Sequence, residues 1–310
     1  MDAKKIIKVT ALLMGNQFEI SAVSLSEEVA NQSIHAAINE IKRIEKLLTT
    51  YHDSSETNLI NRNAGIAAVA VSEEIFNLIE RSIRISGITQ GAFDITYGSI
   101  DKSLWNFDTQ MKSLPDKETA KEMVRLINYR NIILDRENTT VFLNEKGMRI
   151  GFGGIGKGYA AEMAKTTMQQ LGITSGIVNA SGDLTTWGAQ PNGEEWTIGI
   201  ANPNILGEVF SFLKISGLAV ATSGNYEKFI VIDGKKYSHT IDPRTGLPVT
   251  GIKSVTIITK NAEIADAMAT PVTIMGVNAG LHMINQMKDI EVIIIDDFDK
   301  IHHSNNIRFN

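Results

Sequence analysis

Residues 229–241 read Phe-Ile-Val-Ile-Asp-Gly-Lys-Lys-Tyr-Ser-His-Thr-Ile, and this stretch decides the fold class. Aliphatic and aromatic residues lie on both sides of Asp233-Gly234, and Asp-Gly is a preferred two-residue hairpin turn. The stretch therefore predicts two adjacent antiparallel strands, Phe229 to Asp233 and Lys236 to Ile241.

Further strands and a few helices are predicted on either side of this hairpin. The strands span 7–13 and 18–23 around Gly15-Asn16, then 131–135, 139–143, 176–180, 196–200, 209–215, 254–259 and 291–296. The helices span 27–48, a stretch after Ser72, 158–171 ending at Gly172, 262–275 and 278–287. The strands follow one another in runs, and the helices are grouped between these runs. We therefore expect an α+β fold, with mostly antiparallel strands and helices packed around them in a single domain over 1–310.

Composition excludes several classes of protein. The net charge is −5, with 30 basic and 35 acidic residues and no basic stripe, so a nucleic-acid partner is not expected. The absence of cysteine excludes disulfides and thiolate chemistry. The apolar run from Val9 to Met14 is too short for a signal peptide, and no transmembrane segment is expected. The compartment stays open: cytoplasmic for the sequence as it stands, extracytoplasmic if a leader was removed.

The segment Gly151-Phe-Gly-Gly-Ile-Gly-Lys-Gly158 leads into a predicted helix and has three interpretations. It matches the dinucleotide fingerprint, but a buried first strand and an acidic ribose ligand are lacking. It nearly matches a phosphate-binding loop, but position 158 is glycine where a Ser or Thr would hold magnesium. The third interpretation is a tight turn with close helix packing. All three leave exposed N–H groups, a helix N-terminus and Lys157 as an anion cradle.

A carboxylate and a hydroxyl lie one helical turn apart at Asp266 and Thr270. Residues four apart share a helix face, and Pro271 should kink or end the helix and free backbone carbonyls. Oxygen ligands of this kind suit Mg²⁺. A solvated aspartate beside a threonine that bonds its own helix is the alternative.

The residues His239 to Gly246 leave a strand and enter a turn through Asp242-Pro243. His239 is a candidate general base beside Asp242; alternatively, Asp242 only caps the turn and His239 is a satisfied edge residue. A nearby predicted loop, Ala221 to Tyr226, adds hydroxyl groups and an aromatic ring.

Taken in order, several segments resemble the ApbE family of flavin transferases. They are Met14-Gly15, Thr50-Tyr51, Gly91 to Asp94, Gly153 to Gly158, Asn179 to Asp183, Thr222 to Gly224, His239 to Gly246 and Ala265 to Thr270. The resemblance runs from about residue 7 to about residue 295.

The resemblance implies an Mg²⁺-dependent FAD:protein FMN transferase, which joins FMN from FAD to a Thr or Ser of an acceptor flavoprotein and releases AMP. It implies metal ligation by Asp266, Thr270 and the carbonyls of Gly154 and Ala269, and a base at His239. It also implies an FAD site lined by Met14, Tyr51, Ala92, Phe93, Asp94, Gly151, Lys157, Thr240 and Ile241.

Two departures and two alternatives accompany this resemblance. Many members have an aspartate where this chain has Gly151, and members are often exported and lipid-anchored. An Mg²⁺-dependent FAD pyrophosphatase, giving FMN and AMP, would use the same site with water as the acceptor. A non-catalytic FAD-binding protein is the alternative from another class.

Overall fold

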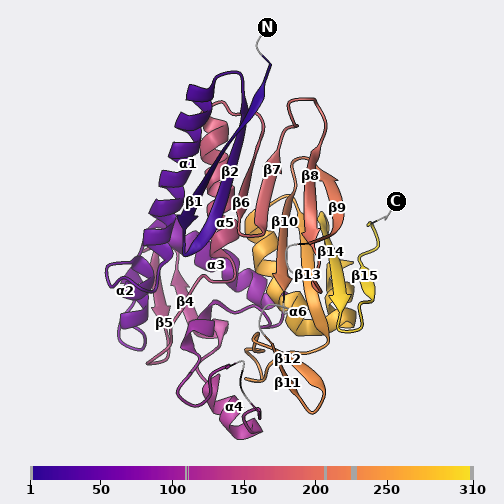
Figure 1. Cartoon of the computed structure of the whole chain (residues 1–310). Coiled ribbons are helices and arrows are strands. Elements are labelled where there is room, and N and C mark those ends of the chain that lie inside the picture. Colours follow the sequence, from indigo (N-terminus) through magenta and orange to yellow (C-terminus); the bar gives the residue numbers. More distant parts are fainter. Residues whose placement is uncertain (1–2, 109, 111, 206–207, 225–228, 308–310) are drawn as a thin grey trace.

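An eight-stranded sheet forms the centre of the computed structural model, which describes residues 3–108, 110, 112–205, 208–224 and 229–307 (Figure 1). Every neighbouring pair in this sheet is antiparallel. The strand order is β1 (Lys5–Leu13), β2 (Asn16–Ser24), β6 (Gly176–Ala180), β7 (Asp183–Trp187), β10 (Ala219–Gly224), β13 (Ile252–Thr259), β14 (Ile290–Asp296) and β15 (Ile301–His303). The predicted α+β class with mostly antiparallel strands is confirmed.

Three long helices, α1 (Glu27–Leu48), α5 (Gly156–Gln170) and α6 (Ala262–Ile284), pack against one face of this sheet (Figure 1). The predicted apolar stripe of α1 is buried in the main core, and the hydroxyl of Ser26 caps its first turn by accepting from the N–H of Val29. Each fully buried aliphatic side chain of this kind stabilises the fold by about 1.5–3 kcal/mol. Burial of this stripe therefore holds α1 against the sheet and against α5.

A two-stranded ribbon, β8 (Trp196–Ala201) and β9 (Val209–Ile215), packs against the opposite face through a second core. This core includes Leu184, Trp196, Val220 and Ile293. Because the centre of the sheet is covered on both faces, all eight residues of β13 are buried.

Smaller elements complete the fold. They are α2 (Glu56–Arg62), β3 (Val69–Ala70), α3 (Glu73–Ile88), η1 (Ile95–Ser99), α4 (Lys117–Met123), η2 (Tyr129–Asn131), β4 (Ile132–Asp135), β5 (Thr140–Leu143), β11 (Phe229–Ile232) and β12 (Lys235–Ser238). Of these, α2, α4, β4, β5, β11 and β12 lie in the lower half of Figure 1. The hydroxyl of Ser72 accepts from Ile75 N–H, as predicted for the N-cap of α3. The Asp233-Gly234 turn joins β11 to β12 with both residues at positive φ, as a two-residue hairpin requires.

The structure corrects four local predictions. The first hairpin turns at Met14-Gly15, not at Gly15-Asn16, because Leu13 pairs with Asn16. The strand β12 ends at Ser238, not at Ile241. Helix α6 continues through Pro271 and breaks at Gly276, whose φ of 81° and ψ of 170° are not helical. The predicted loop at 221–226 is instead the end of β10 up to Gly224, and its residues 225–226 lie outside the described part.

Within the described residues, α6 is long and apolar enough to cross a membrane by length and composition. Half of its apolar window is buried inside the protein, where α6 packs against α5 and against β10 and β13 of the sheet, and core helices pass the same test. One such helix is weak evidence, so no membrane-spanning segment is indicated among the described residues.

Candidate active site

A cavity of about 750 Å³ opens where the start of β7, the end of β10 and the first turns of α5 and α6 meet. Its volume lies in the range of about 300–1,000 Å³ that is usual for small-molecule sites. The walls come from distant parts of the chain: residues 50–51, 92–95, 97–98, 102, 149–151, 153–154, 157, 183, 222–224, 239–241, 243, 266, 269–270 and 274.

Every site residue predicted from the sequence lines this cavity except Met14. Met14 lies in the turn between β1 and β2, and its terminal methyl group packs behind the first turn of α5, near Gly156. Met14 was predicted to contact the flavin, but it does not line the cavity.

The first turn of α5 touches α6 without any intervening side chain. The N–H of Gly158 donates to Asp266 Oδ2 at 2.9 Å, and the backbone N–H of Lys157 also stabilises this carboxylate. A Cβ on Gly158 would lie 2.1 Å from the carbonyl oxygen of Ala262, so only glycine allows this approach. Two of the N–H groups in the predicted anion cradle, those of Lys157 and Gly158, are thus bound to a carboxylate of the protein itself.

Burial is the main cause that raises the pKa of Asp266, to about 7, and the nearby charge of Asp183 adds to it. The side chain is only 7% exposed. A buried carboxylate of this kind gains most from a cation bound beside it, because the cation favours the ionised form.

Further hard oxygen donors line the same cavity as Asp266. Thr270 lines the cavity one turn further along α6, and Gly154 and Ala269 line it too. The carbonyl of Ala269 lies within α6 and also accepts from Thr273 Oγ1 at 3.0 Å. Within the described residues, no three His, Asp or Glu side chains group together. This donor set fits a cation such as Mg²⁺, which takes few protein ligands and keeps waters or substrate phosphates.

A buried ion pair adjoins the carboxylate of Asp266. The ammonium of Lys157 binds Asp183 Oδ2, and Asp183 is 3% exposed at the start of β7. Burial raises the pKa of Asp183, while Lys157 and the backbone N–H of Thr222 oppose that rise. Asp183 is a cavity residue that the sequence does not single out for a role, although it ends the family-like segment from Asn179.

One wall of the cavity is aromatic. Tyr51 is 93% exposed at the cavity, whereas Phe93 and Ala92 are buried. Asp94 is also buried, and its carboxylate accepts from Thr96 N–H at 2.8 Å and from Tyr129 N–H at 2.8 Å. Asp94 therefore organises the wall, while the exposed ring of Tyr51 is available to a planar ligand.

His239 directly follows β12, is exposed and lines the cavity. Its ring is in edge contact with Phe107, with 6.3 Å between the ring centroids. Asp242 instead accepts from the backbone N–H of Arg244 and forms a bidentate ion pair with that side chain. Asp242 therefore caps the turn, as the alternative interpretation predicts. Thr240 and Ile241 hold this segment against 248–249 by backbone pairing.

Two cationic side chains in the cavity lining were not expected from the sequence. Lys102 and Arg149 are exposed and line the cavity near Tyr97 and Gly98. The backbone of Arg149 is fixed by Ser99, whose hydroxyl accepts from its N–H at 2.8 Å. No sequence motif marks Lys102 and Arg149 as site residues, because only the fold brings η1 beside the glycine segment.

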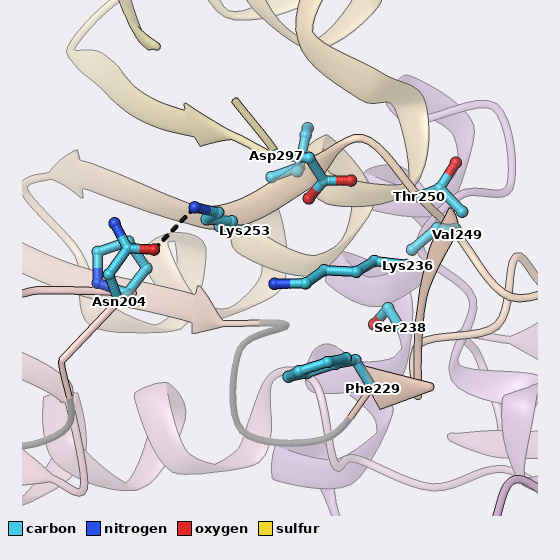
Figure 2. Close-up of a pocket in the computed structure, with 10 residues that line it drawn as sticks. Asn204, Phe229, Lys236, Ser238, Val249, Thr250, Lys253 and Asp297 are labelled. Atoms are coloured by element: carbon cyan, nitrogen blue, oxygen red, sulfur yellow. Dashed lines mark hydrogen bonds between the residues drawn. The ribbon is translucent and has the colours of Figure 1, made fainter. Parts of the chain in front are cut away.

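Figure 2 shows a second, smaller cavity of about 210 Å³ on the other side of β12. Lys236 and Lys253 reach into it, and the ammonium of Lys253 donates to Asn204 Oδ1 at 2.7 Å. Ser238 lines this cavity whereas His239 lines the larger one, since successive residues of extended backbone face opposite sides. The predicted site residues all belong to the larger cavity or its surroundings, which is therefore the candidate active site.

Comparisons with known proteins agree with the sequence resemblance. The model of the ApbE family matches residues 14–294. A relative from Klebsiella pneumoniae (strain 342), named FAD:protein FMN transferase, is 31% identical over 297 residues, which cover 95% of this chain and 90% of the relative. A protein of the same name from Vibrio cholerae is 27% identical over 305 residues, with the same two coverages. The crystal structure of the ApbE protein from Thermotoga maritima superposes with a TM-score of 0.85 and 29% identity, covering 97% of each chain.

Proposed function

Because this chain belongs to the ApbE family, we propose that it is an Mg²⁺-dependent FAD:protein FMN transferase, which transfers FMN to a Thr or Ser hydroxyl of an acceptor protein and releases AMP. The observation that carries this function is a single cavity lined by a buried carboxylate, a neighbouring hydroxyl, a lysine and an exposed histidine. The names of the relatives supply the class of reaction.

The oxygen donors described above would hold Mg²⁺: Asp266, Thr270 and the carbonyls of Gly154 and Ala269. When bound, the metal ion would neutralise charge on the pyrophosphate of FAD. The N–H of Gly158 keeps the carboxylate of Asp266 in place for this task.

The remaining residues bind, orient and move a proton. Tyr51 and Phe93 offer ring surface to the planar parts of FAD, and Lys157 supplies positive charge near the phosphates. His239 accepts the proton of the acceptor hydroxyl on an imidazole nitrogen. The acceptor oxygen then bonds to the phosphorus of the FMN half, while the bond from that phosphorus to the oxygen of AMP breaks. A base of this kind typically adds about 10²- to 10⁴-fold in rate.

The reaction is tested by incubating the protein with FAD, Mg²⁺ and a threonine-containing acceptor peptide, and then measuring the peptide mass and free AMP. A matched peptide with alanine in place of threonine is the control. We expect FMN adduct on the first peptide only, with one AMP per adduct. Release of FMN and AMP without adduct would instead identify a pyrophosphatase, and intact FAD would identify a binding protein.

A further inference from the structure

We propose that Asp183 is a positioning residue of the transfer reaction, a role that rests on the proposed function. Its carboxylate holds the ammonium of Lys157 at the same end of the cavity as Asp266, where this charge meets the pyrophosphate of FAD. No sequence motif assigns a role to Asp183. The role proposed here follows from the position of Asp183 in the fold.

The backbone around Asp183 fixes its carboxylate in one position. The β6–β7 turn passes through Ser181 and Gly182, both at positive φ, and places Asp183 as the first residue of β7. The neighbouring strand β10 contributes the backbone N–H of Thr222 to the same carboxylate. A carboxylate held by two strands of the central sheet is a rigid anchor.

Lys157 is flexible in itself, and the anchor removes that flexibility. It is the second residue of α5, its side chain is 28% exposed, and it lines the cavity. A lysine side chain has many accessible rotamers, so an unanchored ammonium would occupy many positions. Its ammonium has three donors, and binding Asp183 leaves the group facing the cavity.

Charge balance gives a second reason for the anchor. A divalent cation at Asp266 would repel a nearby ammonium, since like charges at a few ångströms interact strongly in a partly buried site. Asp183 supplies the counter-charge that keeps both positive groups at one end of the cavity. A purely structural ion pair does not need this location: Arg81 and Glu263 also pair through a buried carboxylate, and they lie outside the cavity lining.

The test compares Asp183→Asn, Lys157→Met and the double variant in steady-state FMN transfer with varied FAD. We expect Asp183→Asn to lower kcat by about 10- to 100-fold, as small misplacements of a catalytic group do, with the KM for FAD changed less than about threefold. The double variant should be no slower than Lys157→Met. Glu263→Gln, which breaks the matched pair, should leave kcat within about twofold of wild type.

A second measurement does not depend on activity. The ammonium resonance of Lys157, assigned with Lys157→Met, should be visible by ¹⁵N NMR in the metal-free wild type and should broaden beyond detection in Asp183→Asn. Lys157→Arg keeps the buried carboxylate and an ion pair but moves the charge, so it should lower kcat at unchanged KM even if Asp183→Asn fails to fold.

The outcomes separate the two proposals. If wild type makes no FMN adduct, the proposed function fails while the NMR comparison still tests the anchor. If wild type transfers FMN but Asp183→Asn keeps kcat within about threefold, or the double variant loses the product of the two single losses, the positioning role is refuted.

Discussion

Substitution of Gly158 by alanine tests whether the close approach of α5 and α6 builds the active site. The new Cβ would lie 2.1 Å from Ala262 O, 2.7 Å from Ala262 C and 2.7 Å from Asp266 Cβ. Two of these atoms belong to the backbone and cannot rotate away. The helices must therefore separate, which also breaks the 2.9 Å hydrogen bond from Gly158 N–H to Asp266.

Three contributions determine how far Gly158→Ala lowers the free energy of unfolding. Overpacking against backbone costs about 3 kcal/mol, loss of a hydrogen bond to a charged group about 2 kcal/mol, and the better helix propensity of alanine returns about 1 kcal/mol. The free energy of unfolding should thus fall by about 4 kcal/mol. For 310 residues the entropy of unfolding is about 0.65 kcal/mol per kelvin, so Tm should fall by about 6 °C.

Calorimetry measures this change, and Mg²⁺ titration measures its consequence for the metal site. Gly87→Ala is the matched control, because Gly87 is helical and a Cβ there meets no atom within 4 Å. The control should melt at or slightly above the wild-type temperature. The reasoning is refuted if Gly158→Ala melts within about 1 °C of wild type and binds Mg²⁺ with wild-type affinity.

Three further predictions follow from the site and its supports. Asp266→Ala should raise the Kd for Mg²⁺ by more than about 100-fold in calorimetric titration, since losing a residue that only orients a ligand already costs about 10- to 100-fold; an unchanged Kd would remove Asp266 from the metal site. His239→Ala should lower kcat by about 10²- to 10⁴-fold with little change in FAD binding measured by flavin fluorescence, and a loss confined to binding would make His239 a wall residue only. Glu74 has its pKa lowered mainly by the hydrogen bond from Arg43; its contribution is therefore present above the unfolded pKa of 4.5 and lost as pH falls through the folded value. The gap in Tm between wild type and Glu74→Gln should shrink in melts from pH 7 towards pH 3, and a gap that is constant with pH would contradict this role.

The hairpin that decides the fold class was predictable because its signal is local. Asp233 and Gly234 both adopt positive φ, which their residue types favour, and the strands on either side pair in register. The strand β7 was not predictable in this way: Thr185 and Thr186 are polar, yet they are fully buried at the centre of the sheet. Their burial depends on neighbours on both faces, which no local pattern reports.

The sequence predicted most residues of the candidate site, but it did not predict which of them bind one another. The spacing of Asp266 and Thr270 predicted a shared helix face, and both line one cavity with the glycine segment. Residue types could not reveal that Gly158 N–H binds Asp266, because the partners are 108 positions apart. Likewise, Lys157 was interpreted as part of an open anion cradle, since its partner Asp183 lies on a strand that the sequence pattern does not show.

The scattered origin of the cavity wall has a consequence for synthesis on the ribosome. Asp266 and Thr270 belong to α6, one of the last elements of the described chain to emerge, whereas Tyr51 and Phe93 emerge early. A nascent or prematurely terminated chain that lacks α6 carries the aromatic wall without the donors for the metal. If the proposed function holds, a chain truncated before α6 would lack the metal donors on which transfer from FAD depends.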